Sequence, residues 1–244
     1  MNSDPIGILG YGRFGRVMMR LLSPEHDVFF YDVNEALYQE THFKPLLELL
    51  KLPTLILAVP IGRLEKLLQQ IGPQIKAKTV IDVCSVKIYP TKWMLQYLPK
   101  ETNIIATHPM FGPDSYESNN KNMMMYPVRI SAKLFHLWQA YFTGKNIHIS
   151  LMTPEQHDKE TAFSQNLTHF LGRVLGQLTL QDTEVATVGY KSLLKIVQQT
   201  CNDSWELFYD MFHYNPYSEL MIEKLNIAKN DIVAKLEGEK THGE

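Results

Sequence analysis

A histidine flanked by prolines is the residue best placed to do chemistry in this sequence. The segment from Thr107 to Pro113 reads THPMFGP, and it follows a short apolar run at residues 103–106 that is typical of a strand. We predict that the strand ends before His108, at the edge of the sheet where open α/β proteins bind their ligands. A histidine held stiffly there can accept a proton near neutral pH. The segment therefore predicts a general base, with a purely structural histidine as the alternative.

A glycine-rich turn near the N-terminus indicates which group this base works beside. Residues 10–15 read GYGRFG, the pattern G-x-G-x-x-G, between a predicted strand and a predicted helix. There Gly10 allows a tight turn, Gly12 lets the backbone approach a pyrophosphate, and Gly15 lets the helix pack closely on the strand. The helix N-terminus adds unpaired N–H groups that attract phosphate. In this context a nicotinamide dinucleotide site is a better interpretation than a surface turn.

An acidic residue after the second predicted strand favours NAD over NADP. Asp32 stands where a carboxylate accepts hydrogen bonds from ribose hydroxyls and repels a 2′-phosphate, and no arginine follows it in residues 33–35. NAD is therefore the expected cofactor, with NADP as the alternative. Val59 and Pro60, at the end of the third strand, are expected to line the nicotinamide half. The cofactor-binding residues that we expect are Gly10, Gly12, Arg13, Phe14, Gly15, Asp32, Val59 and Pro60.

A second strand end carries polar side chains that can work with His108. Residues 82–87 read DVCSVK after an apolar strand. A serine near a histidine suggests a nucleophile, but Ser85 lacks the G-x-S-x-G elbow that such a nucleophile uses. Beside a nicotinamide site, Ser85 is better placed to hydrogen-bond a substrate hydroxyl or to orient His108. We therefore predict His108 and Ser85 as the catalytic residues.

The helical part of the chain carries a polar stripe. Gln165, His169 and Arg173 are spaced four residues apart, which places them on one helix face. The stripe is either a solvated face or the lining of a cleft, since apolar residues cover the other directions. His157 lies twelve residues before His169, about a third of a turn out of phase, and no further ligand cluster accompanies them. No metal site is expected.

The elements that position these residues alternate between strand and helix and then become helical only. The expected strands are residues 5–9, 27–31, 54–59, 79–83, 103–106, 127–130 and 146–150. The expected helices are residues 14–22, 41–50, 63–71, 91–97, 132–142, 154–178, 183–211 and 217–236, with a polar loop at 114–122 and a frayed tail at 237–244. This order predicts an α/β fold. We expect a Rossmann-type doubly wound parallel sheet in residues 1–151, followed by a smaller all-helical domain in residues 152–244.

Composition excludes several kinds of partner. The 244 residues carry a net charge of −2, so the chain has no basic field for nucleic acid or an anionic membrane. No apolar run approaches the roughly 20 residues that span a bilayer. The two cysteines, Cys84 and Cys201, are too few for a disulfide framework, which favours a reducing compartment. We therefore expect a cytoplasmic protein that acts on a small molecule.

Taken in order, these segments resemble the prephenate/arogenate dehydrogenases of tyrosine biosynthesis, and especially the plant-like arogenate branch. The resemblance runs over nearly the whole chain. The segments that carry it are residues 10–15, 82–87, 107–113, 157–159, 164–165, 168–169, 172–173 and 202–209. It implies an NAD(P)-binding domain, and a helical domain that builds a homodimer and closes the cleft. It also implies oxidative decarboxylation, in which His108 takes the C4 hydroxyl proton as hydride leaves C4, Ser85 binds that hydroxyl and His169 holds the substrate.

The chain departs from the bacterial members of that family at several positions. Lys195 stands where many of them have an arginine for a substrate carboxylate, so the charge is kept and the bidentate fork is lost. Gln165 and Asn166 replace a Ser-His pair. Asp203 lies where arogenate-using members have an acidic residue, and it is expected to bind the substrate ammonium. Asp32 differs from the residue expected in the plant enzymes, which are mostly NADP-linked. The substrate-binding residues that we expect are Gln165, His169, Arg173, Lys195 and Asp203.

Two other interpretations of the sequence stay open. A β-hydroxyacid dehydrogenase or imine reductase shares this layout but usually has a catalytic lysine in its helical domain. Only Lys191 and Lys195 could serve, and residues 107–113 would then have no role. The other alternative is a non-catalytic module that binds NAD as a sensor. The presence of both His108 and Ser85 argues against it.

Overall fold

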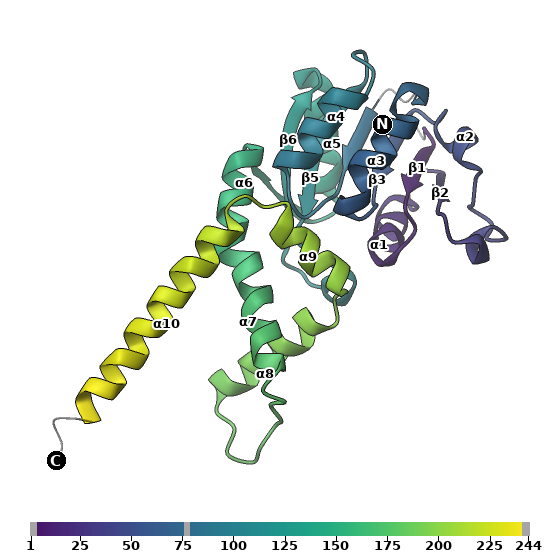
Figure 1. The fold of residues 1–244 in the computed structure, drawn as a ribbon. Coiled ribbons are helices and arrows are strands. Elements are labelled where there is room, and N and C mark those ends of the chain that lie inside the picture. The colour runs from purple at the N-terminus through teal and green to yellow at the C-terminus, as the bar shows by residue number, and fades with distance from the viewer. Residues whose placement is uncertain (1–3, 76–78, 241–244) are drawn as a thin grey trace. The chain divides into compact units, whose positions relative to one another are not determined.

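The chain divides into two compact units in the computed structural model, which describes residues 4–75 and 79–240 (Figure 1). Unit 1 is Met1–His157 and unit 2 is Asp158–Glu244. The boundary expected after residue 151 lies a little earlier, inside unit 1. Helix α6 (Pro154–Thr161) begins beyond that boundary, and its first turns belong to unit 1, where the His157 side chain bonds to His108.

Unit 1 is built on a seven-stranded sheet with the order β2-β1-β3-β4-β5-β6-β7. The strands are β1 (Ile6–Leu9), β2 (Val28–Tyr31), β3 (Thr54–Leu57), β4 (Thr79–Asp82), β5 (Asn103–Pro109), β6 (Lys121–Arg129) and β7 (Ile147–Leu151). After β1 the chain forms β2 on one side and then β3 on the other. The carboxyl ends of β1 and β3 therefore flank the topological switch point, where open sheets of this kind bind their ligands.

The direction of the last two strands differs from the prediction. Strands β1 to β5 pair in parallel, but β6 runs antiparallel to β5 and β7 is parallel to β6. The segment between β5 and β6 contains the short 3₁₀ turn η3 (Pro113–Ser115) in place of the crossover helix that a parallel pair needs. The sheet is therefore Rossmann-like and mostly parallel.

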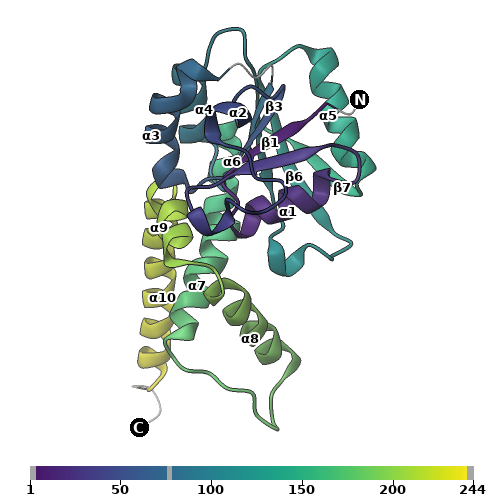
Figure 2. The same cartoon turned by 90° about the vertical axis from the view of Figure 1, so that its right-hand side faces the viewer.

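Helices cover both faces of this sheet (Figure 2). They are α1 (Arg13–Leu22), α2 (Leu46–Leu49), α3 (Ile61–Ile71), α4 (Ile88–Tyr97) and α5 (Ala132–Gly144), with 3₁₀ turns η1 (Glu35–Leu37) and η2 (Gly72–Gln74). Helices α1 and α5 share one hydrophobic core, whereas α3 and α4 lie together on the opposite face (Figure 2). Because both faces are covered, β1, β3 and β4 are buried at every position.

Two local predictions in unit 1 were wrong. The helix expected at residues 41–50 is helical only in α2, because Phe43 forms an isolated parallel bridge with Phe30 and packs its ring against the Phe30 ring. The loop expected up to residue 122 ends earlier, and β6 already begins at Lys121. Its Met123–Met125 run is buried in the sheet, which explains why these apolar residues form a strand.

The described residues of unit 2 form helices and connecting loops without a strand, as predicted. Its helices are α6, continued by the π-helical segment η4 (Ala162–Asn166) and by α7 (Leu167–Gly176), then α8 (Val188–Cys201), α9 (Trp205–His213) and α10 (Ser218–Lys240). Helices α7 and α8 pack closely at Gly172. A Cβ added there would lie 2.0 Å from Thr200 Oγ1, so only glycine permits this approach.

The single helix expected at residues 183–211 is in fact two helices. Thr187 caps the start of α8, and Ser204 caps α9 by accepting a hydrogen bond from Leu207 N. Serine at such a position stabilises a new helix start, which explains the break after α8. The tail expected to fray from residue 237 is helical through Lys240 in α10, and residues 241–244 lie outside the described residues.

None of the helices in residues 4–75 and 79–240 combines the length and the apolar character needed to cross a membrane. Within the same residues, no group of three or more His, Cys, Asp or Glu side chains is placed to hold a metal ion.

Candidate active site

The turn between β1 and α1 has the geometry of a phosphate-binding turn. Gly10 has a φ of 93°, and a Cβ there would lie 2.4 Å from Ala58 O, so this position requires glycine. A Cβ on Gly15 would lie 2.1 Å from Gly10 O, which is why helix and strand can approach so closely. No described atom lies within 4 Å of a Cβ on Gly12, so the space beside that residue is open.

Two further features beside this turn suit a dinucleotide. Gly12 is the N-cap of α1, and within the described chain no side chain caps that helix start, so its N–H groups remain available for phosphate. Asp32 lies at the end of β2, where Oδ2 accepts from Tyr11 N at 2.7 Å and Oδ1 accepts from Asn34 N at 2.9 Å. These bonds fix the carboxylate, and each oxygen keeps a second lone pair for a ribose hydroxyl.

The expected cofactor residues Val59, Pro60, Phe14 and Arg13 all lie near this turn or on α1. Val59 and Pro60 follow β3, and Val59 Cγ1 is 3.1 Å from the Cβ position of Gly10. The rings of Phe14 and Phe111 are 6.5 Å apart. Arg13 forms a 2.9 Å ion pair with Asp114, an interaction that its sequence position did not indicate.

These last contacts bring the two sequence motifs of unit 1 together. Phe14, at the start of α1, contacts Phe111 of the segment 107–113. Arg13, the residue before it, pairs with Asp114, which directly follows that segment. Residues about 100 positions apart in the sequence are therefore neighbours. The histidine of the second motif lies in the same compact unit as the dinucleotide turn.

His108 is buried within β5. The strand was expected to end before it, but pairing with the antiparallel β6 extends β5 to Pro109, with His108 opposite Met124. Only 4% of the residue is exposed. Its Nδ1 lies 2.8 Å from Nε2 of His157, and the two rings meet edge to face. This contact occupies Nδ1, so Nε2 is the ring nitrogen that remains for a ligand.

His108 is a neutral base in this environment. Burial lowers its pKa well below the ordinary value of 6.5, and the neighbouring His157 and the Lys87 ammonium lower it further. At neutral pH the imidazole is therefore uncharged and able to accept a proton.

A buried ion pair ties together the two strands that carry the catalytic candidates. Lys87 donates to Asp82 Oδ1, and it also donates to Thr107 O at 2.5 Å. In return, Thr107 Oγ1 donates to the backbone oxygen of Asp82 at 2.6 Å. Burial raises the pKa of Asp82, and the Lys87 ammonium opposes that rise. The pair links the end of β4 to Thr107, the residue that precedes His108 on β5.

Ser85 lies after β4, between Asp82 and Lys87 in the sequence. Its hydroxyl oxygen is buried and has no hydrogen-bond partner among the residues that the structure describes. Of the two roles expected for Ser85, the structure contains no bond that would orient His108, because His157 occupies that place. The hydroxyl remains available to a ligand.

Four of the five expected substrate residues lie together in unit 2. His169 Nδ1 is 3.9 Å from Asp203 Oδ2, and Arg173 Nη2 donates to the backbone oxygens of Asp203 at 2.6 Å and Ser204 at 3.4 Å. Gln165 belongs to the π-helical segment one turn earlier. His169 and Arg173 are each only 8% exposed, so the stripe is not a solvated face.

This stripe presents unsatisfied polar atoms. Gln165 Oε1, His169 Nδ1 and Arg173 Nε are buried without a hydrogen-bond partner in the described part of the chain. Burial lowers the pKa of His169, the Asp203 carboxylate raises it and Arg173 lowers it. Because buried polar atoms normally find partners, three such atoms on one face indicate a place where a polar ligand binds.

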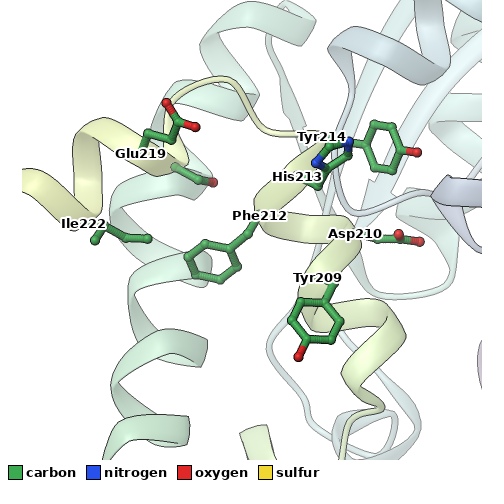
Figure 3. A pocket seen from close by; sticks show the side chains of 8 residues that line it. Tyr209, Asp210, Phe212, His213, Tyr214, Glu219 and Ile222 are labelled. Atoms are coloured by element: carbon green, nitrogen blue, oxygen red, sulfur yellow. The ribbon is translucent and has the colours of Figure 1, made fainter.

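The fifth expected residue is not part of this group. Lys195 is exposed on α8, and among the described residues it makes no hydrogen bond or ion pair. A pocket of about 400 Å³ on α9 and α10 contains none of the five (Figure 3). Its lining residues are Tyr209, Asp210, Phe212, His213, Tyr214, Ser218, Glu219 and Ile222.

Known proteins match both halves of the chain. The model of the prephenate dehydrogenase nucleotide-binding domain matches residues 35–126, and the model of a TYRAAT1-like C-terminal domain matches residues 174–244. Arogenate dehydrogenase 1, chloroplastic, of Arabidopsis thaliana is 32% identical over 97% of this chain and 40% of that protein. Arogenate dehydrogenase 2, chloroplastic, of the same plant is 30% identical over 96% of this chain and 70% of that protein. The chain belongs to the prephenate/arogenate dehydrogenase family.

The fold agrees with that membership. The crystal structure of prephenate dehydrogenase from A. aeolicus in complex with hydroxyphenyl propionate and NAD+ matches with a TM-score of 0.74 and 18% identity, over 98% of this chain and 94% of that one. The similarity to the plant proteins confirms the resemblance to the plant-like branch. Membership also sets aside the β-hydroxyacid dehydrogenase and imine reductase alternative.

Sequence reasoning missed several features of this family member. His157 was noted only as part of a matching segment, and its bond to His108 depends on tertiary structure. The ion pair between Lys87 and Asp82 was also missed. The only signal for it was an acidic and a basic residue five positions apart at the end of a strand. The π-helical segment before His169 has no distinct sequence signal, yet such segments are frequent at functional sites.

Proposed function

We propose that this protein catalyses the NAD-dependent oxidative decarboxylation of arogenate or prephenate in tyrosine biosynthesis. The observation that carries the proposal is a buried, neutral histidine beside a dinucleotide turn in one compact unit. His108 supplies the base, and the contacts of Phe14 with Phe111 and of Arg13 with Asp114 join its segment to the turn. Family membership supplies the reaction class, and the Arabidopsis relatives carry the name arogenate dehydrogenase.

The residues of unit 1 are suited to the proton movements of this reaction. The bound cofactor supplies a hydride acceptor for C4 of the substrate. His108 Nε2 takes the proton of the C4 hydroxyl while Ser85 Oγ hydrogen-bonds that oxygen. The carboxylate on the ring then leaves as CO2, and its electron pair makes the ring aromatic. His108 returns its proton to the phenolate oxygen, which leaves the residue neutral for the next turnover.

The site residues favour NAD as the cofactor. The open space at Gly12 and the uncapped start of α1 suit a pyrophosphate, and the Asp32 carboxylate, held beside this turn by Tyr11 N, can accept from the adenosine ribose hydroxyls. A fixed carboxylate would repel a 2′-phosphate, which disfavours NADP.

We infer that arogenate is the preferred substrate. Arogenate carries an ammonium group where prephenate carries a keto group, and the Asp203 carboxylate can bind that ammonium. Gln165, His169 and Arg173 offer the unsatisfied polar atoms described above. Lys195, exposed on α8, remains a proposed contact for a substrate carboxylate on the strength of the family resemblance alone.

The chain spans 40% of the length of one Arabidopsis relative and 70% of the other. The oligomeric state and the cellular compartment of this protein are therefore proposed from its own residues. We propose a homodimer built by unit 2, because α10 exposes Ile227, Ile232, Val233 and Leu236. Sedimentation at micromolar concentration should give twice the chain mass, and a monomer would contradict the dimer. Neither Cys84 nor Cys201 forms a disulfide within the described residues, which is in keeping with a reducing compartment such as the cytoplasm.

A four-way steady-state assay tests the function. Prephenate and arogenate are each offered with NAD and with NADP, and reduced nicotinamide is followed by its absorbance. We expect the highest kcat/KM with arogenate and NAD. An enzyme that binds NAD but turns over none of the four combinations would contradict the proposal and support the sensor alternative.

A further inference from the structure

We propose that His157 is a positioning residue that holds His108 with its proton on Nδ1, so that Nε2 is the atom that receives the substrate proton. The geometry is a 2.8 Å contact between His108 Nδ1 and His157 Nε2. Both residues are buried, with 4% and 1% of their surfaces exposed. The inference deepens the proposed function, because it specifies how the base of that reaction is prepared.

The contact has two arrangements, and only one of them gives a base. Two neutral imidazoles share a single hydrogen in such a bond. If His157 Nε2 donates, then the proton of His108 lies on Nε2 and that atom cannot accept another. If His108 Nδ1 donates, Nε2 has a lone pair for the substrate hydroxyl. The proposed reaction therefore requires His157 Nε2 to be the acceptor.

The surroundings explain why an uncharged acceptor suits this base. Asp82 on β4 and Lys87 just after that strand form a buried ion pair, and Lys87 is the ammonium that acts on His108. Burial disfavours a charged imidazole, so His108 is neutral at neutral pH. When Nε2 takes the substrate proton, His108 becomes a donor at both nitrogens. The His157 lone pair then keeps the imidazolium in the same orientation, as the carboxylate orients the histidine of a Ser-His-Asp triad, but without adding a negative charge.

Helix α6 is suited to fixing the orientation of the His157 ring. The His157 backbone nitrogen donates to Thr153 O at 2.9 Å, and Thr153 Oγ1 accepts from Gln156 N at 3.2 Å. His157 therefore lies in the first turn of a helix whose start is capped by Thr153. The backbone oxygen of the next residue, Asp158, accepts a hydrogen bond from Asn215 Nδ2 at 2.8 Å. A helical position held by these bonds gives the acceptor a defined direction.

Nitrogen NMR tests the tautomer without any turnover. The full chain is labelled with ¹⁵N-histidine, the His108 signals are assigned by comparing wild type with His108→Gln and His157→Gln, and long-range proton–nitrogen correlations are recorded at neutral pH. We expect a protonated Nδ1 and a bare Nε2 on His108. A proton on Nε2 would overturn the proposal. Because this readout needs no substrate, it decides the tautomer even if the proposed function fails.

A pair of substitutions tests the consequence for the rate. Gln can place an acceptor oxygen near the position of His157 Nε2, whereas Leu cannot. We expect His157→Leu to lower kcat by about 100-fold with NAD affinity unchanged, and His157→Gln to retain activity within about tenfold of wild type.

Controls separate positioning from a structural role. His148→Leu, at an exposed histidine on β7, should leave kcat unchanged. Circular dichroism and the Tm show whether each variant folds. Equal losses of kcat in folded His157→Leu and His157→Gln, or full activity in His157→Leu, would overturn the proposal.

Discussion

The proposed chemistry depends on keeping one buried histidine neutral. His108 is buried, it faces another histidine, and the nearest ammonium is paired with a carboxylate. Each of these features favours the neutral imidazole, and none supplies a free negative charge that would favour the imidazolium. A base of this kind is ready at neutral pH without first losing a proton.

The low pKa of His108 makes a prediction about pH. Activity that depends on the neutral imidazole is lost as the pH falls through its pKa, and that pKa lies well below 6.5. The acid limb of kcat/KM should therefore lie well below pH 6.5. A pH profile measured with the preferred substrate and cofactor checks this. An acid limb at or above pH 6.5 would mean that His108 is not buried as described or is not the base.

Asp32 makes a prediction about the cofactor. Asp32→Ser removes the negative charge that repels a 2′-phosphate, so the ratio of kcat/KM for NAD to that for NADP should fall by about tenfold or more. The exposed neighbour Glu35 provides the control, since Glu35→Ser should leave the ratio unchanged. An unchanged ratio in Asp32→Ser would show that Asp32 does not select NAD over NADP.

Asp203 makes a prediction about the substrate. A charge-assisted bond to the ammonium of arogenate contributes about 1.5–3 kcal/mol, so Asp203→Asn should lower kcat/KM for arogenate by about 10- to 100-fold. The effect on prephenate, which has no ammonium, should be much smaller. Asp231→Asn, at an exposed position on α10, is the matched control. Equal losses on both substrates would show that Asp203 acts only through the position of His169 or Arg173.

At the scale of elements, the candidate site is built on β4 and β5, because side chains at the end of each strand hydrogen-bond to the other strand. Asp82 Oδ1 accepts from the Lys87 ammonium and from Cys84 N, and Lys87 also reaches Thr107 O. The segments after both strands are thereby fixed, and with them Ser85 and His108.

Breaking this pair should destabilise unit 1. Lys87→Met leaves the buried Asp82 carboxylate without its counter-charge, and we expect the free energy of unfolding to fall by about 3–5 kcal/mol. The double variant Asp82→Asn/Lys87→Met should recover part of that loss, because it removes the buried charge as well. Denaturant unfolding measures both, with Lys92→Met on the exposed side of α4 as control. A Lys87→Met variant as stable as wild type would show that the Asp82–Lys87 pair does not stabilise unit 1.

Much of the secondary structure follows from local sequence, and the exceptions have tertiary causes. Strands β1 to β5 are short apolar runs, so their positions could be predicted from composition and spacing. The direction of β6 depends on what connects it to β5, and the isolated bridge at Phe43 depends on Phe30 in another strand. The His108–His157 bond joins residues 49 positions apart, and neither residue indicates the other locally.

At the scale of the whole molecule, two compact units divide the groups of the proposed reaction. Unit 1 contains the dinucleotide turn, His108 and Ser85, and unit 2 contains the buried stripe with Asp203. The sequence indicated this division, because the pattern changes from alternating strands and helices to helices alone. The boundary itself could not be located from the pattern, since α6 is one continuous helix whose early residue His157 bonds within unit 1.

The most direct test of the account is the product balance of one reaction. Wild-type protein is incubated with arogenate and NAD, and tyrosine, CO2 and reduced nicotinamide are measured together, with His108→Gln in parallel. We predict equal amounts of all three products from wild type, and a rate at least about 100-fold lower from the variant with NAD binding intact. Reduced nicotinamide without matching CO2 and tyrosine, or an undiminished rate in His108→Gln, would contradict the claim that His108 is the base of an oxidative decarboxylation.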